Sequence, residues 1–215
     1  MLPPQTQGDA MTTDTLSHRH LFVPATDPGR PPLLLLHGTG GDESDLVPLG
    51  RAVAPGAALL SPRGAVLEQG RPRFFRRLAE GVFDEADVER RAHDLADFLV
   101  EAQARYGLAA PVALGFSNGA NIAAALLWLR PEVLAGAVLL RPMVPLARPP
   151  SGRLEGRPVL ILSGSADPIV PAENAARLAE RLTEAGAALT HRTLPAGHGL
   201  TQRDLDLTTE WLAAL

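Results

Sequence analysis

Short apolar runs alternate along this chain with segments in which apolar residues recur every three or four positions. The runs predict mostly buried strands at 18–23, 33–36, 57–60, 112–116, 135–140, 159–162 and 189–194. The helical spacing predicts helices from a cap at Asp84 to about residue 102, and at 122–129, 175–182 and 201–215. Strands that alternate with helices indicate the α/β class, with a mostly parallel sheet of about seven strands and helices on both faces.

The chain divides into a short tail and one domain. Residues 1–17 are mostly polar and have no strand or helix pattern, so we expect a loose tail. Residues 18–215 have the length of a single α/β domain. The longest irregular stretch is 63–83, and a loop of that length is usually functional. No interval between the predicted elements is long enough for a separate cap domain.

Composition excludes several classes of function. The chain has no cysteine, which excludes disulfides, thiolate metal sites and a cysteine nucleophile, and which fits a cytoplasmic location. The formal net charge is −4, so we expect no nucleic-acid partner. The apolar runs are far shorter than the roughly 20 residues of a membrane span, so we expect none.

A serine stands between two glycines where a predicted strand meets a predicted helix. The segment Gly115–Gly119, GFSNG, fits the G-x-S-x-G pattern of a nucleophile elbow. The serine of this pattern occupies a tight turn, and larger flanking residues would collide with neighbouring elements. A simple Gly-Ser turn is the alternative, but the strand–turn–helix setting favours the elbow. We therefore predict that Ser117 is a nucleophile.

A serine nucleophile needs a base, and two histidines follow Ser117. His191 lies inside the last predicted strand, at a packing or surface position. His198 follows that strand in a glycine-flanked loop, which would let its ring reach the elbow. We therefore expect His198 to be the base.

The base in turn needs an orienting acid, which follows the serine and precedes the histidine in chains with this elbow. Asp167 stands shortly after the predicted strand at 159–162. Its alternative role is a helix cap or an Asp-Pro turn. Glu173 and Asp204 are rivals, but both lie in predicted helical turns. The predicted catalytic residues are Ser117, Asp167 and His198.

A glycine-rich loop, HGTGGDE at 37–43, follows the predicted strand at 33–36. A tetrahedral intermediate needs two N–H donors for its oxyanion. We assign the oxyanion hole to the backbone amides of Thr39 and Asn118. His37 precedes the serine, so we expect it to brace this loop rather than to act as the base.

Cofactor sites are not expected in this chain. The glycine loop does not fit a dinucleotide fingerprint, because Glu43 stands where its last glycine belongs. A phosphate-binding P-loop needs a lysine, and all 20 basic residues are arginine. The histidines and acids do not have metal-ligand spacing, so we expect neither a cofactor nor a metal.

These motifs together resemble the α/β-hydrolase fold and, within it, the phospholipase/carboxylesterase family. The family's LHG-x-G opening, GFSQG elbow, G-x-x-D-x-x-V-P acid motif and GH pair are similar to Leu36–Gly40, Gly115–Gly119, Gly164–Pro171 and Gly197-His198, with Asn118 in place of Gln. The resemblance covers nearly everything from His37 to His198. It implies a small α/β-hydrolase without a cap domain, and it makes a homodimer a reasonable expectation.

A finer resemblance lies in residues 61–64, 73–77 and 80–84, which are similar to a bacterial carboxylesterase branch. Some of its members are called hydroquinone-associated esterases or, loosely, dienelactone hydrolases, although true dienelactone hydrolases use a cysteine. By family position the 63–83 loop borders the active site. This position of the loop implies that Arg63, Phe75 and Arg76 bind the substrate. The alternative for the arginines is loop-fixing salt bridges to the acids at 84, 85 and 89.

The sequence thus predicts a serine carboxylesterase that hydrolyses small, short-chain esters through an acyl-enzyme. The same residues would also serve a thioesterase or a lysophospholipase. A non-catalytic ligand-binding protein of this fold is the third alternative, but it has no physical need for all three triad groups.

Overall fold

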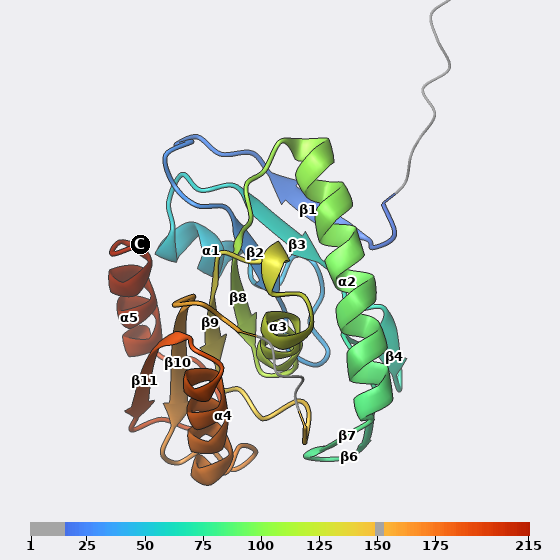
Figure 1. Cartoon of the computed structure of the whole chain (residues 1–215), viewed down its shortest axis with the longest axis vertical. Coiled ribbons are helices and arrows are strands. Elements are labelled where there is room, and N and C mark those ends of the chain that lie inside the picture. The colour runs from blue at the N-terminus through green and yellow to red at the C-terminus, as the bar shows by residue number, and fades with distance from the viewer. Residues whose placement is uncertain (1–15, 149–152) are drawn as a thin grey trace, which may run out of the picture.

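The computed structural model describes residues 16–148 and 153–215, which form one twisted sheet covered by helices (Figure 1). All seven predicted strands lie in this sheet, in the order β1-β3-β2-β8-β9-β10-β11. Their bounds are β1 His20–Val23, β2 Leu33–Leu36, β3 Leu59–Pro62, β8 Val112–Phe116, β9 Gly136–Leu140, β10 Pro158–Gly164 and β11 Ala188–Leu194. Only β1 pairs antiparallel with its neighbour, so the predicted mostly parallel sheet is confirmed.

Helices cover both faces of the sheet, as the sequence predicts. Figure 1 shows α2 (Glu85–Tyr106), α3 (Asn118–Leu129) and α4 (Ala172–Glu184) in front of the sheet. Residues of α1 (Val47–Val53) and α5 (Gln202–Leu212) pack in the second core cluster, on the other face. This arrangement explains the run of four leucines in β2, because alternate side chains of a strand point to opposite faces.

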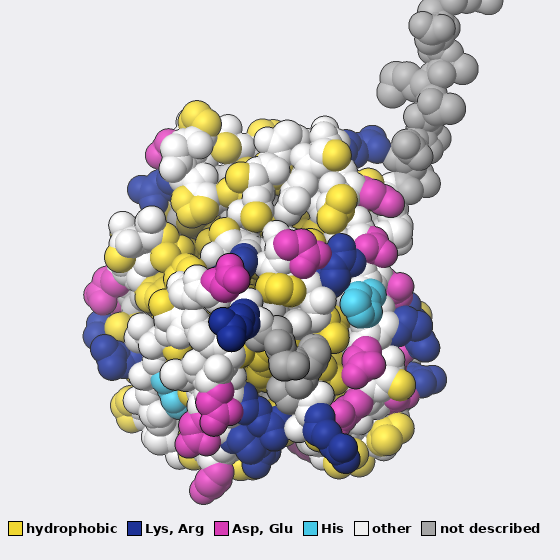
Figure 2. Space-filling model, in the orientation of Figure 1, with side chains coloured by type: hydrophobic (Ala, Val, Ile, Leu, Met, Phe, Trp, Pro, Cys, Tyr) yellow, Lys and Arg dark blue, Asp and Glu magenta, His cyan; other side chains and the backbone are white. Residues whose placement is uncertain are grey.

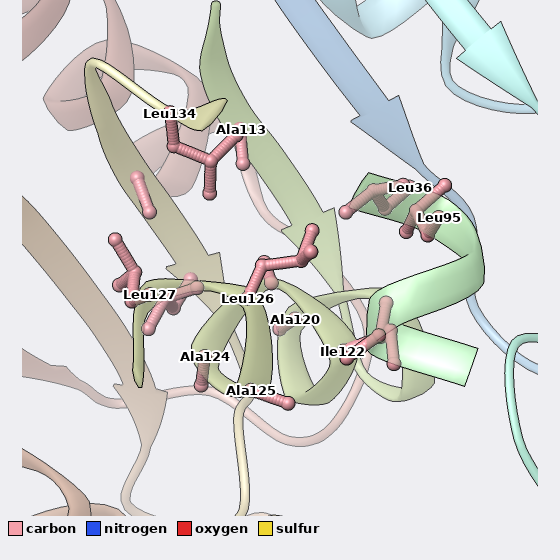
Figure 3. Packing of buried hydrophobic residues seen from close by; sticks show 14 of the residues in the cluster. Leu36, Leu95, Ala113, Ala120, Ile122, Ala124, Ala125, Leu126, Leu127 and Leu134 are labelled. Atoms are coloured by element: carbon pink, nitrogen blue, oxygen red, sulfur yellow. The ribbon is translucent and has the colours of Figure 1, made fainter. Parts of the chain in front are cut away.

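The helix that carries the elbow is buried on every side. Alanine and leucine dominate α3, and the side chains from Asn118 to Trp128 are all buried. Small side chains let this helix approach both α2 and the strands closely. Figure 3 shows Ile122 beside the ribbon of α2, and Leu126 and Leu127 over β8 and β9. Ser117 is therefore held at the start of a tightly packed helix and does not lie in a surface loop.

The expectation of an irregular stretch at 63–83 is wrong. These residues form two small hairpins, with β4 (Val66–Glu68) paired to β5 (Arg71–Arg73) and β6 (Arg77–Ala79) paired to β7 (Val82–Phe83). Gly70 and Gly81 turn the chain between the paired strands with φ of +79° and +72°, a conformation that glycine adopts easily. Strands of two or three residues are too short to show a hydrophobic period.

Two further details differ from the sequence prediction. The short helix α1 was not expected, since a proline and a glycine interrupt its apolar spacing. The predicted tail of 1–17 lies mostly outside the described residues, but Leu16 packs against the first core cluster.

The described part of the chain has no helix with the length and hydropathy needed to cross a membrane. Figure 2 shows arginine and carboxylate side chains interspersed over the lower half of the face in front of α3 and α4.

Candidate active site

Ser117 occupies a sharp turn between β8 and α3. Its backbone has φ 52° and ψ −113°, which is unusual for a residue with a side chain. The Ser117 amide donates to the carbonyl oxygen of Leu140 on the adjacent strand β9, over 2.8 Å. This strained turn is the geometry that the G-x-S-x-G pattern predicts, and it raises the hydroxyl above the strand ends.

The two glycines of the elbow are required by close backbone contacts. A Cβ atom at Gly119 would lie 1.9 Å from the carbonyl oxygen of Leu36, and one at Gly115 would lie 2.5 Å from that of Gly119. Both contacts are with backbone, which cannot move aside without disturbing β2 or α3. The elbow therefore depends on the absence of side chains on both flanks of Ser117.

Replacing Gly119 with alanine is expected to lower the free energy of unfolding by at least about 3 kcal/mol. Overpacking a core with extra side-chain atoms typically costs about 1–3 kcal/mol, and a clash with backbone should cost at least the upper value because the backbone cannot move aside. For a chain of this size that corresponds to a thermal midpoint about 6–12 °C lower, measured by circular dichroism. Gly29→Ala is the control, since its Cβ would meet only the Asp27 side chain, at 3.3 Å. Equal melting of both variants would contradict the steric argument.

Three side chains from three strand ends form a hydrogen-bonded chain. His198 Nε2 lies 3.0 Å from Ser117 Oγ, and His198 Nδ1 lies 2.8 Å from Asp167 Oδ2. Asp167 follows β10, His198 follows β11 and Ser117 follows β8, so all three stand at the carboxyl edge of the sheet, where ligands bind in open α/β folds. The structure thus brings together the three residues predicted from sequence.

The Asp167 carboxylate is buried and well satisfied. Its side chain is fully buried, and Oδ1 accepts the amides of Ile169 and Val170 at 2.8 and 3.0 Å. Burial alone would raise the pKa of Asp167, but the hydrogen bond from His198 and those two amides outweigh it and lower the pKa. The acid is therefore ionised at neutral pH, as an orienting partner for an imidazolium must be.

The rival residues have other contacts. His191 Nε2 lies 2.8 Å from Ser163 Oγ within the sheet, and burial lowers the pKa of His191. Glu173 is exposed in the first turn of α4. Asp204 is buried in an ion pair with Arg141. None of the three reaches the hydroxyl of Ser117 through a hydrogen bond among the described residues.

Thr39 and Asn118 line a small hollow of about 40 Å³ together with Ser117. Asn118 is the first residue of α3, and the amides of a first helical turn have no partner within the helix. Its side-chain oxygen accepts the amide of Phe74 at 2.8 Å, and the Thr39 hydroxyl accepts from Arg73 at 2.6 Å. Both residues are thus held by hydrogen bonds beside the serine.

His37 uses both ring nitrogens to hold the glycine loop. Nδ1 donates to the carbonyl oxygen of Gly38 at 2.7 Å, and Nε2 accepts the amide of Gly64 at 2.9 Å. Burial lowers the pKa of His37, which keeps the ring neutral and able to accept this amide. The bonds match the bracing role predicted for His37.

The structure does not bring Arg63, Phe75 and Arg76 to this hollow. Arg63 pairs with Glu43 and, at 3.2 Å, with Asp42. Arg76 is exposed and pairs with Asp84 at 2.5 Å, which is one of the loop-fixing bridges considered above.

Phe75 is fully buried, and its ring packs edge-on against Phe83. The side chain therefore supports the wall from behind instead of forming it. The wall that the sequence implied at 63–83 exists, but other residues of that segment supply it.

Ten further residues line the hollow and were given no site role of their own from the sequence, and they are Arg73, Arg77, Glu80, Gly81, Phe83, Asn121, Arg141, Met143, Ile169 and Val170. Phe83 and Gly81 also line an adjoining hollow of about 370 Å³. A larger hollow, of about 670 Å³, lies at the opposite edge, where Pro32 precedes β2 and where Val112 and Pro158 begin β8 and β10. Size alone therefore does not locate the site, whereas the hydrogen-bonded side chains do.

Comparisons with known proteins find relatives over most of the chain. Residues 20–215 match the family described as phospholipase/carboxylesterase. The chain is 46% identical over 181 residues to "Putative hydrolase MhqD" of Bacillus subtilis (strain 168), with 83% of this chain and 90% of that protein covered.

Solved structures show the same fold. A carboxylesterase of Bacillus cereus superposes with a TM-score of 0.90 at 45% identity, over 92% of this chain and 94% of that one. YahD, whose structure was solved with malic acid, superposes with a TM-score of 0.87 at 28% identity, over 92% of this chain and 98% of that one.

Proposed function

Because this chain belongs to the phospholipase/carboxylesterase family of α/β-hydrolase enzymes, we propose that it is a serine carboxylesterase in which Ser117, His198 and Asp167 form the catalytic triad. The observation that carries the proposal is the unbroken chain of hydrogen bonds from the Ser117 hydroxyl through the His198 ring to the buried Asp167 carboxylate. The 3.0 Å between Ser117 Oγ and His198 Nε2 suits proton transfer without rearrangement, and the 2.8 Å bond from His198 Nδ1 to Asp167 holds the ring in the orientation for it.

The reaction follows from these positions. Ser117 Oγ attacks the ester carbonyl carbon while its proton passes to His198 Nε2, and the carbonyl oxygen becomes an oxyanion that the amides of Thr39 and Asn118 stabilise. His198 then gives the proton to the leaving alkoxide, and an alcohol departs. Water repeats the sequence on the acyl-enzyme, with His198 as base, and releases the carboxylic acid. Asp167 stabilises the imidazolium in both halves.

A covalent probe tests the assignment. An organophosphonate should add one phosphonyl group to the wild-type protein, and peptide mass spectrometry should place it on Ser117. The Ser117→Ala protein should stay unlabelled. Phosphonylation of another residue, or no labelling of a folded wild type, would contradict the proposed nucleophile.

The walls around Ser117 favour small acyl groups. The hollow that contains the hydroxyl is only about 40 Å³, and Phe83 stands between it and the adjoining hollow of about 370 Å³. Each methylene gains about 0.8 kcal/mol only when it is fully buried. We therefore expect kcat/KM for p-nitrophenyl esters to be highest from acetyl to butyryl and to fall beyond about six to eight carbons.

Phe83→Ala is expected to join the two hollows and to move this optimum toward longer acyl chains. Leu78→Ala is the matched control, because Leu78 lies on the same hairpin but is 73% exposed. The measurement is kcat/KM across the ester series for all three proteins. A wild-type preference for palmitoyl esters or for thioesters would contradict the small pocket and favour a lysophospholipase or a thioesterase.

The ester panel should include carboxylate-bearing acyl groups. Arg73 and Arg77 line the hollow, where both also pair with Glu68, and a guanidinium can bind a carboxylate through two parallel hydrogen bonds. The structure of the relative YahD with malic acid adds a reason to include them. A homodimer and a cytoplasmic location stay predictions from the sequence.

A further inference from the structure

Arg141 is a buried cation that the proposed reaction does not use. It follows β9 directly, its side chain is 0% exposed, and its backbone has φ of +54°. A residue with a side chain seldom holds this conformation, and strained positions of this kind gather at functional sites. The amide of Arg141 donates to the carbonyl oxygen of Leu162 on β10 at 2.8 Å, which fixes the start of its side chain.

The guanidinium uses all five of its N–H donors. Two of them form a fork on the Asp204 carboxylate, at 2.7 and 2.9 Å. The other three reach the carbonyl oxygens of Gly197, Gly199 and Leu162, at 2.9, 3.2 and 3.1 Å. A guanidinium has five donors in a fixed planar arrangement, so the position of each acceptor is tied to the others.

Two of these carbonyls belong to the residues on either side of His198. Glycines flank the histidine, and they have no side chains through which packing could hold the loop. The imidazole itself is partly exposed, with 19% of its side chain accessible. The His198 ring bonds to Asp167 and packs against Phe116. The rest of this loop is held through its backbone, and Arg141 donates to two of its carbonyl oxygens.

Asp204 holds the other end of the arrangement. Its side chain is fully buried, and it accepts both the amide and the hydroxyl of Thr201 at 2.8 Å, which caps α5. Burial would raise the pKa of Asp204, but the bonds from Arg141 and Thr201 lower it. A buried ion pair is weak evidence for stability, because desolvation offsets much of its attraction. The geometry of the Arg141–Asp204 pair therefore points to a role in positioning the loop around His198 rather than in stability.

We infer that the Arg141–Asp204 pair is a positioning device that sets the His198 loop against the nucleophile. The end of β9 contacts both Ser117 and the His198 loop. The Leu140 carbonyl accepts the Ser117 amide, and the next residue, Arg141, donates to the carbonyl oxygens on either side of His198. The distance from Ser117 Oγ to His198 Nε2 is then fixed from one place in the sheet. This inference rests on the proposed triad, and it makes Arg141 a positioning residue rather than a catalytic one.

Two variants test the inference. Arg141→Met combined with Asp204→Asn leaves no unpaired buried charge and keeps an acceptor for the Thr201 amide, but it removes the bonds to the two glycine carbonyls. Arg141→Lys keeps the charge opposite Asp204 with fewer donors. We expect kcat for a short ester to fall on the order of 10- to 100-fold in the double variant, the effect of misplacing a catalytic group by about 1 Å. The KM should stay within about threefold. The lysine variant should lie between it and the wild type.

A change in stability is separated from a change in position by Leu212→Ala. Leu212 is a buried residue of α5 in the second core cluster, away from the guanidinium contacts. This control should lower the thermal midpoint without lowering kcat. An equal loss of kcat in Leu212→Ala and in the double variant would overturn the inference.

A folded double variant with kcat within about threefold of the wild type would also overturn it. If the double variant does not fold, the kcat and KM of Arg141→Lys test the inference instead, and a kcat equal to that of the wild type would overturn it. Ser117→Ala in the same assay separates the two proposals. Activity in Ser117→Ala contradicts the triad, whereas an inactive Ser117→Ala beside fully active Arg141 variants contradicts only the positioning role.

Discussion

Ser117→Ala is expected to lower kcat for ester hydrolysis on the order of 10⁴- to 10⁶-fold, because removal of one triad member abolishes the covalent route. The fold should be unaffected. The Ser117 hydroxyl bonds to His198, while the backbone bond from the Ser117 amide to the Leu140 carbonyl is kept in the variant. Circular dichroism and a thermal melt should therefore match the wild type.

Initial rates with a short-chain ester measure this effect, and Ser165→Ala is the matched control. Ser165 is an exposed serine on the loop that leads to Asp167, and its backbone amide donates to the carbonyl oxygen of Leu194. It should keep wild-type kcat. If Ser117→Ala kept more than about a tenth of the wild-type activity, the assigned nucleophile would be wrong.

His198→Ala is expected to cause a loss of similar size, whereas His191→Ala should keep kcat within about threefold. Both imidazole rings are partly buried, and each forms a hydrogen bond with a serine hydroxyl, His191 with Ser163 and His198 with Ser117. Only His198 also meets a carboxylate, that of Asp167. The pair of variants therefore separates the base function from the general cost of removing a partly buried imidazole.

The measurement is kcat and kcat/KM across a range of pH for both proteins. The residual activity of His198→Ala should lose the acid limb of the profile, because the group that must be neutral to accept the Ser117 proton is absent. His191→Ala should keep that limb. An essential His191 beside a dispensable His198 would remove the C-terminal half of the proposed site.

The strands were predictable because a parallel sheet with two covered faces demands continuous apolar runs. The leucines of β2 show this directly, since Leu34 and Leu36 lie in one core cluster and Leu33 and Leu35 in the other. The grouping of Ser117, Asp167 and His198 at one edge of the sheet was predictable for a related reason. Chemistry gathers at the carboxyl ends of such strands, and each predicted catalytic residue follows one.

The pocket wall was not predictable from the same signals. Five arginines lie between residues 63 and 77. Which of them faces Ser117 depends on the register of two hairpins whose strands are only two or three residues long. A shift of one residue turns each side chain to the opposite face. The structure accordingly buries Arg73 beside Thr39 and leaves Arg76 exposed.

The role of Arg141 was hidden for a different reason. It looks like an ordinary residue after a strand, and its partner Asp204 lies 63 positions later in the chain. Spacing rules reveal local pairs and repeated patterns, whereas a contact across the fold needs the fold itself.

The complete burial of α3 also has a consequence for how the enzyme is inactivated. Segments that open locally are those with few buried contacts, while the most buried helices exchange their amide hydrogens only when the whole domain unfolds. The helix that begins beside Ser117 belongs to the second kind, because its side chains from Asn118 to Trp128 are buried. Thermal inactivation through loss of the support beneath Ser117 is therefore expected to be the same event as global unfolding, and the half-life of activity on heating should report the lifetime of the native state.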